Sequence, residues 1–284
     1  MTHKSRKGKE MICYNVNGNR GAMIMKIPFE IWYPAVFKRQ SRRSYLPRLP
    51  EEGIVARLES VCGEFRPFSE VRVELVKDKP EKVFKGIIGR YGKVTGAPYY
   101  IAFVGDMSSP RVQECAGYVG EAIILQATAL GLGTCWVGGM FRPKVAAAHV
   151  PLEDGEKILS VTPVGYAEES YNTTEKLLKR FAKSAKRKSL NQLISNGHIH
   201  SPWVEKAVEA ARLAPSAANR QPWRFSIGDD SITISMETAR DSSFISRRLD
   251  CGIAMLHIEV GALAAGVSGR WEFLDHPDVA KFVV

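Results

Sequence analysis

The sequence predicts an α+β fold made of two diverged repeats, each with a mostly antiparallel sheet packed on central helices. Helical and strand-like segments follow one another in the same order in both halves of the chain. Short peptides also recur at equal spacing, since residues 129–132 and Trp136 match residues 264–267 and Trp271. A repeated order of elements with matching peptides indicates a duplicated chain.

The first half contains six predicted elements. In chain order they are a helix over 30–45, an amphipathic helix over 51–62, strands over 70–76 and 99–104, a buried helix over 119–130 and a strand over 157–164. The alternation of apolar and charged residues in 70–76 is typical of a half-buried strand. Residues 119–130 are apolar nearly all round, which is typical of a buried helix.

The second half repeats this plan. We expect a helix over 204–213, strands over 224–227 and 232–236, and a buried helix over 251–265, in which Cys251-Gly252 matches Ala116-Gly117 of the first half. The predicted organisation is a flexible basic extension over residues 1–24, a first repeat over 25–180 and a second repeat over 181–284.

The composition is that of an ordinary soluble globular protein. Of the 284 residues, 45% are hydrophobic and 25% are charged. No apolar run approaches the roughly 20 residues that span a bilayer, and the basic N-terminus lacks the apolar core of an export signal. The five cysteines include no Cys-x-x-Cys pair. We therefore predict a cytoplasmic protein with free thiols and no membrane partner.

The formal net charge of +10 favours an anionic partner, such as a nucleotide cofactor, a nucleic acid or an acidic surface. The positive residues gather in three groups, within 4–9, 38–48 and 176–188. Such runs are usually solvated surfaces or tails, and we interpret the first group and most of the third in this way. The second group coincides with a motif described below.

A polar turn over 214–223 follows the predicted helix at 204–213. Pro215 ends the helix because it has no N–H and crowds the preceding turn. Ser216 and Asn219 then place short donors and acceptors on a loop. Most clusters of this composition are simple turns, but these side chains would also suit a polar heterocycle or a ribityl chain.

The run from Pro215 to Trp223 resembles the Pro-Ser-x-x-Asn-x-Gln-Pro-Trp signature of the FMN-dependent nitroreductase family. Residues 39–45 are similar to the family's Arg-x-Ser-x-Arg-x-aromatic phosphate motif, and residues 131–139 to the segment whose backbone lies along the flavin ring. Residues 161–166 resemble the strand that follows. The resemblance covers about residues 36–273, and it implies a nitroreductase-like fold of the fused, single-chain subgroup.

The resemblance also implies the cofactor-binding residues. The phosphate would be bound by Arg39, Gln40, Ser41 and Arg43, with Arg187 as a further contact. Arg39 and Arg43 are four residues apart, so on a helix they would share one face. The ring would lie along Trp136, Val137, Gly138 and Gly139, and backbone N–H groups of the last three would stabilise the reduced ring. The loop would contribute Pro215, Ser216, Ala217 and Asn219. The family often has Pro and Glu where this chain has Trp136 and Gly138.

The implied activity is FMN-dependent oxidoreduction of nitroreductase type. A reductant such as NAD(P)H would load the flavin, which would then reduce a small aromatic or quinone-like acceptor in a ping-pong cycle. No catalytic side chain is expected, because flavin N5 carries the chemistry. No metal is expected either, since His198 and His200 lack nearby ligand partners in the sequence.

The family ordinarily forms intertwined homodimers, so a fused chain is expected to be a monomer that acts as a pseudo-dimer. We predict one FMN per chain, because residues 63–68 and 187–191 lack the groups needed for the reciprocal site. One alternative is a basic nucleic-acid- or anion-binding protein with a decayed flavin site, although aromatic residues do not interleave with the basic runs. Another is a flavoprotein with a different redox task, such as dehalogenation or a dehydrogenase step.

Overall fold

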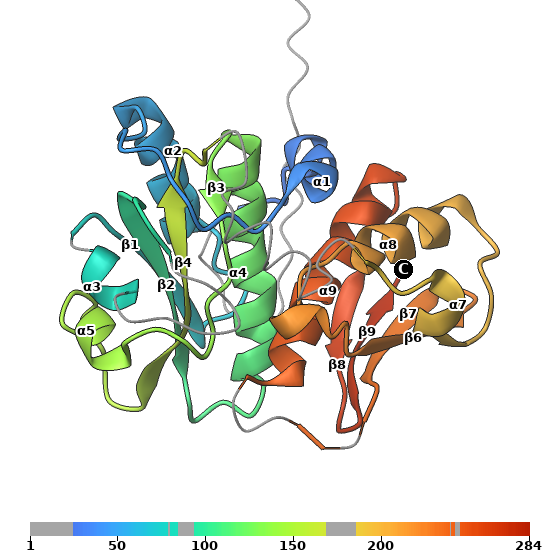
Figure 1. Cartoon of the computed structure of the whole chain (residues 1–284). Helices are drawn as coiled ribbons and strands as arrows, with labels where there is room; N and C mark the ends of the chain where they lie inside the picture. The colour runs from blue at the N-terminus through green and yellow to red at the C-terminus, as the bar shows by residue number, and fades with distance from the viewer. Residues whose placement is uncertain (1–24, 79, 85–93, 169–185, 239, 242–244) are drawn as a thin grey trace, which may run out of the picture.

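Two sheets flank a central pair of long helices in the computed structural model (Figure 1). The structure describes residues 25–78, 80–84, 94–168, 186–238, 240–241 and 245–284. The central helices are α4 (Val112–Ala129) and α9 (Arg247–Ala264), one from each half of the chain. The predicted extension over 1–24 and the predicted boundary near residue 180 lie outside the described residues.

The first half forms a four-stranded antiparallel sheet with the order β1-β2-β4-β3. Its elements are α1 (Phe29–Lys38), α2 (Glu52–Glu64), β1 (Val71–Val76), α3 (Pro80–Phe84), β2 (Tyr99–Asp106), β3 (Gly133–Thr134), α5 (Pro143–Ala147) and β4 (Glu156–Gly165). Strand β2 is buried along almost its whole length. Phe103 packs in the core shared with α4, and Ala102 packs in a second cluster on the opposite face of the sheet.

The second half forms a five-stranded sheet with the order β5-β6-β7-β9-β8. Its elements are α7 (Leu190–Leu193), β5 (Ile194–Asn196), α8 (Pro202–Arg212), the 3₁₀ turn η1 (Ala217–Asn219), β6 (Trp223–Gly228), β7 (Ser231–Met236), β8 (Arg270–Phe273) and β9 (Asp278–Val283). Strands β6-β7-β9-β8 correspond in order to β1-β2-β4-β3 of the first sheet, and the parallel strand β5 is added beside β6. The predicted α+β architecture with two similar halves is therefore confirmed.

The central helices cross where each has a glycine. A Cβ atom on Gly117 would lie 2.0 Å from the Leu249 carbonyl oxygen, and one on Gly252 would lie 1.9 Å from the Glu114 carbonyl oxygen. Only glycine allows this approach, because any larger residue would overlap the facing backbone. These two glycines are the matched pair seen in the sequence, so the crossing is built alike from both halves.

The predicted bounds of two helices differ most from those in the structure. Helix α4 begins seven residues before the predicted 119, and its first turn contains the buried Glu114, which binds Arg248 of α9 at 2.7 Å. The prediction of a helix over 30–45 is wrong beyond Lys38. Ser41 instead forms a bridge with Thr134, so the chain runs extended beside β3. Arg39 and Arg43 therefore do not share a helix face.

No helix in the described ranges is long and apolar enough to cross a membrane. Four of the five cysteines lie in the described part of the chain, namely Cys62, Cys115, Cys135 and Cys251, and all four are buried free thiols, as predicted.

Candidate functional site

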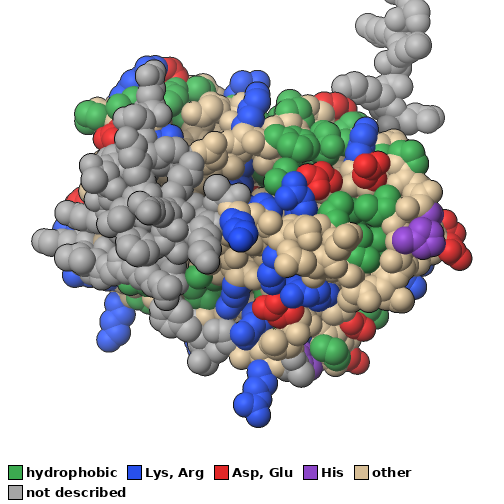
Figure 2. All heavy atoms as spheres, turned by 45° about the vertical axis from the view of Figure 1, so that its right-hand side comes forward, with side chains coloured by type: hydrophobic (Ala, Val, Ile, Leu, Met, Phe, Trp, Pro, Cys, Tyr) green, Lys and Arg blue, Asp and Glu red, His purple; other side chains and the backbone are tan. Residues whose placement is uncertain are grey.

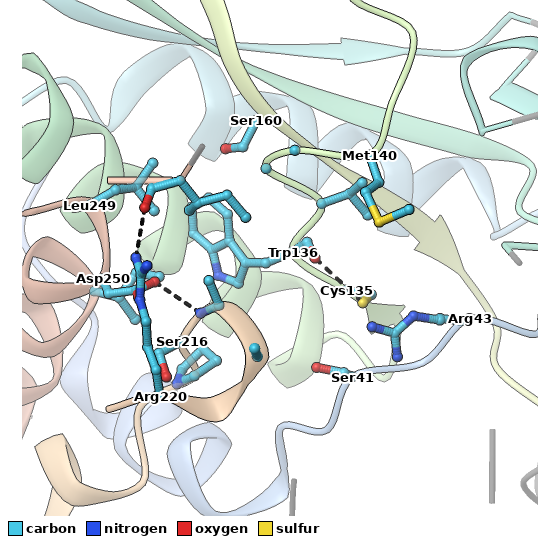
Figure 3. Close-up of a pocket in the computed structure, with 18 of the residues that line it drawn as sticks. Ser41, Arg43, Cys135, Trp136, Met140, Ser160, Ser216, Arg220, Leu249 and Asp250 are labelled. Carbon is cyan, nitrogen blue, oxygen red and sulfur yellow. Dashed lines mark hydrogen bonds and ion pairs between the residues drawn. The ribbon is translucent and has the colours of Figure 1, made fainter. Parts of the chain in front are cut away.

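A pocket of about 240 Å³ lies between the two halves of the chain. Both halves contribute to its walls, as Figure 3 shows for Ser41, Trp136, Ser216 and Asp250. The lining residues are Ser41, Arg43, Val94, Cys135, Trp136, Val137, Gly138, Gly139, Met140 and Ser160 from the first half, and Pro215, Ser216, Ala217, Ala218, Arg220, Ile245, Leu249, Asp250 and Ile253 from the second.

The segment from Ser41 to Arg43 reaches the pocket because it lies against β3. The Arg42 N–H donates to the Thr134 carbonyl at 2.8 Å. A Cβ atom on Gly133 would lie 3.2 Å from the Cβ atom of Arg42 and 2.8 Å from that of Ala167, so glycine permits this close approach. The side chains of Ser41 and Arg43 then line the pocket.

The segment after β3 supplies a second wall. The Trp136 indole N–H donates to Glu121 of α4 at 2.7 Å, and the centroid of the Trp136 ring lies 4.7 Å from that of the Phe103 ring. The Val137 N–H donates to the Val161 carbonyl, so the expectation that this amide serves a bound ring is wrong. The amides of Gly138 and Gly139 donate to no described residue, and they remain available to a ligand.

The loop after α8 supplies the third wall in an unusual backbone conformation. Ala218, Asn219 and Gln221 have φ values of 52°, 56° and 48°, which non-glycine residues adopt only when other contacts hold them. One such contact is the hydrogen bond from the Gln221 N–H to Ser216 Oγ at 2.9 Å. A loop held in this way presents a fixed surface to the pocket.

Asp250 of α9 holds the same loop from inside the pocket. Its Oδ1 accepts the Ala217 N–H at 3.1 Å, and its Oδ2 accepts the Arg220 Nε–H at 2.6 Å (Figure 3). Arg220 in turn donates to the carbonyl oxygens of Ile245 and Ser246. Burial raises the pKa of Asp250 to about 6, although the nearby Arg220 favours its charged form.

A group of buried charges lies directly behind the pocket lining. Arg39 is 7% exposed, and its Nε lies 3.7 Å from Glu121 Oε1 without a hydrogen bond to any described residue. The same oxygen lies 3.0 Å from His257 Nε2. Arg187 donates to Asn219 Oδ1 at 2.5 Å. The pKa of Arg187 is lowered to about 10, mainly by burial and also by repulsion from the positive charge of Arg39. The two guanidinium groups are therefore close enough to interact.

The structure thus places nine of the predicted residues on one pocket, namely Ser41, Arg43, Trp136, Val137, Gly138, Gly139, Pro215, Ser216 and Ala217. The other four predicted residues do not line the pocket. Gln40 is adjacent to Ser41 in the chain, Arg39 and Arg187 lie behind the lining, and Asn219 accepts a hydrogen bond from Arg187. Ser160, Arg220 and Asp250 also line the pocket, and they were not predicted from the sequence. Asp250 directly precedes the predicted buried helix over 251–265, and this position was a usable signal, whereas nothing in the sequence singles out Ser160.

The fold and the pocket define a two-repeat α+β protein whose candidate site lies at the junction of the repeats. The family model described as “Putative TM nitroreductase” matches residues 32–262, so the chain belongs to this family. A “putative nitroreductase” from Thermotoga maritima is 22% identical in sequence. Its crystal structure has a TM-score of 0.60, with 95% of this chain and 98% of that chain covered, which shows the same fold.

Two further solved structures match more distantly. A nitroreductase family protein from Clostridium difficile is 21% identical, covering 60% of this chain and 98% of that chain with a TM-score of 0.42. A nitroreductase with bound FMN from Desulfitobacterium hafniense is 19% identical, covering 49% and 91% with a TM-score of 0.40. No curated protein matches the sequence.

Proposed function

We propose that this protein is an FMN-dependent oxidoreductase of nitroreductase type. The observation that carries the proposal is a pocket between the halves that both of them line. One half contributes Ser41, Arg43 and the segment around Gly138, and the other contributes the loop that begins at Pro215 and Ser216. These are three of the four segments on which the resemblance to the family depends, although they are far apart in the sequence.

The chemistry of the pocket fits FMN. Arg39, Arg43 and Arg187 concentrate positive charge at this side of the pocket. The carboxylate of Glu121 lies close to Arg39, but it also contacts His257 and accepts a hydrogen bond from Trp136. A dianionic phosphate could accept charge-assisted hydrogen bonds from such a group of guanidinium ions. The Nε atom of Arg39 is buried, lies 3.7 Å from Glu121 and has no hydrogen-bond partner among the described residues.

The residues of the chain would bind and orient the cofactor rather than react. Arg39, Ser41 and Arg43 would hold the phosphate, and the amides of Gly138 and Gly139 would donate to the polar edge of the ring. Apolar side chains such as Leu249 and Ile253 exclude water from the same space. When bound, FMN supplies hydride or electron transfer at N5 between a reductant such as NAD(P)H and a small aromatic or quinone-like acceptor.

The structure offers little support for a nucleic-acid-binding role. Of the third basic group, Lys186–Lys188 lie in the described part of the chain. Arg187 and Lys188 are engaged with the pocket loop through Asn219 and Gln221. On the face in Figure 2, Lys and Arg side chains lie along the middle, with single Asp and Glu side chains among and beside them.

The absorption spectrum of the protein tests the proposal. Protein saturated with FMN should show bound-flavin bands in the blue that bleach anaerobically with NAD(P)H. Replacing both Arg39 and Arg43 with Ala should weaken FMN binding at least a hundredfold, because two charge-assisted contacts of about 1.5–3 kcal/mol each are lost. A fluorescence titration measures this affinity.

The matched control is Arg57→Ala with Arg270→Ala, which removes the same charge from two exposed positions outside the pocket. It should bind FMN like the wild type. A wild-type protein that stays colourless with added FMN would contradict the proposed function. Equal losses in the two double variants would show that net charge, and not the phosphate motif, governs binding.

A further inference from the structure

Ser160 is a fully buried residue of β4 that lines the pocket. Its hydroxyl oxygen has no hydrogen-bond partner among the described residues. In Figure 3 it lies across the pocket from Ser41 and Ser216. A buried hydroxyl without a partner destabilises a folded protein, because it has lost its hydrogen bonds to water. Such a group in a pocket wall therefore needs an explanation.

The surroundings of Ser160 within the protein do not call for a hydroxyl. Ser160 is the register partner of Phe103 on β2, and the Phe103 ring packs against Trp136. The next residue, Val161, packs in the hydrophobic cluster on the opposite face of the sheet. Because side chains alternate along a strand, Ser160 shares the face of Phe103 and points toward Trp136 and the pocket. An apolar side chain would suit this setting better.

Thr162, two residues further along the same face of β4, provides a comparison. Its hydroxyl is also fully buried, but it donates to the Pro163 carbonyl at 3.1 Å and accepts the Cys135 N–H at 3.0 Å. That hydroxyl has a structural role that the protein itself satisfies. The Ser160 hydroxyl has the same burial and no partner among the described residues, so it can bond to a group bound in the pocket.

We propose that Ser160 is a ligand-binding residue whose hydroxyl forms a hydrogen bond with a nitrogen or oxygen atom of the planar heterocycle bound beside Trp136 and Val137. The inference rests on the proposed function, since it takes the heterocycle to be the ring of FMN. It assigns to β4 a polar contact that none of the three sequence motifs contains. The contact would help to fix the orientation of the ring between the Gly138 amide and the second-half loop.

The test is Ser160→Ala, compared with the wild type in two states. In protein stripped of flavin, the variant should unfold at a temperature about 2 °C higher, because an unsatisfied buried hydroxyl has been removed. In a fluorescence titration with FMN, its dissociation constant should rise about fivefold to tenfold, because the hydrogen bond to the ring is lost. The two effects thus have opposite signs.

Thr162→Val serves as the matched control for the stability measurement. It should lower the unfolding temperature of the flavin-free protein, because that hydroxyl has two partners. Equal FMN affinity of Ser160→Ala and the wild type would overturn the inference and leave the proposed function intact. A lower unfolding temperature of flavin-free Ser160→Ala would also overturn it, since the hydroxyl would then have a partner in the protein. A wild type that binds no FMN would overturn both.

Discussion

Among the residues of the pocket, Asp250 is kept charged at a cost in stability. Because burial raises its pKa to about 6 from the ordinary 3.8, folding favours the protonated carboxyl. Its contribution to stability is therefore largest below the unfolded pKa and is lost as the pH rises through about 6. A neutral side chain would avoid this loss. We infer that the charge is retained because it fixes Arg220 and the Ala217 amide in the pocket wall.

This arrangement predicts pH-dependent ligand binding. Between pH 7 and pH 5 Asp250 takes up a proton, so its charge-assisted hydrogen bond with Arg220 weakens and the loop around Ala217 is less firmly held. Over this range the FMN dissociation constant of the wild type should rise about tenfold more than that of Asp250→Asn. Fluorescence titrations at several pH values measure the difference.

The comparison with Asp250→Asn is needed because phosphate monoesters also titrate near pH 6. The variant has no carboxyl at this position, so its titration curve contains the ligand's own ionisation and that of the other protein groups. Only the difference between the two curves reports Asp250. Parallel curves for the two proteins would show that Asp250 does not control the loop.

At the scale of elements, the crossing of α4 and α9 brings the two halves of the pocket together. Helix α4 carries Glu121, which binds Trp136, and α9 carries Asp250, which binds the second-half loop. We infer that the distance between these helices influences the width of the pocket. Gly117 and Gly252 fix that distance through direct contact with the facing backbone.

Gly117→Ala should therefore destabilise the whole protein. Its Cβ atom would meet the Leu249 carbonyl oxygen at 2.0 Å, and backbone atoms cannot move aside as a flexible side chain can. We expect a loss of about 3 kcal/mol in the free energy of unfolding, at the upper end of overpacking costs. Urea denaturation measures the loss.

Gly53→Ala provides the control for this substitution. Gly53 is an exposed glycine in α2, and an added Cβ would meet no atom within 4 Å. The change should leave stability unaltered or raise it by up to about 1 kcal/mol, because alanine favours the helix. If Gly117→Ala were as stable as Gly53→Ala, the central helices would not be in the close contact described.

The sequence was sufficient to predict elements whose pattern is local, such as α2, β6 and β7. It failed where an element depends on a distant partner. Helix α1 ends at Lys38 because Ser41 pairs with Thr134, and α4 extends back past Glu114 because Arg248 neutralises that carboxylate 134 residues away. In the pocket, motif residues such as Ser216 could be named in advance. Ser160 could not, because only the fold shows that its hydroxyl lacks a partner.

At the scale of the whole molecule, two similar halves have one described pocket between them. The matched tryptophans place Phe273 at the position that corresponds to Gly138, two residues after Trp271. The Phe273 ring packs against the Phe68 ring with 5.6 Å between the ring centroids, and the Phe68 ring packs against that of Tyr118 with 5.3 Å between centroids. Aromatic rings therefore occupy the space that would correspond to the pocket in the reciprocal arrangement, where residues 63–68 also lack a Ser-x-x-Asn sequence.

We therefore expect each chain to bind one FMN and to do so as a monomer. We infer this because both halves of a single chain line the pocket, and because Phe68 and Phe273 pack together on the reciprocal side. Titration of flavin-free protein with FMN should reach its end point at one equivalent, and the mass of the complex in solution should be that of one chain. An end point near two would show that the Phe273 side admits a flavin, whereas one near one half, with a doubled mass, would show that two chains share a site.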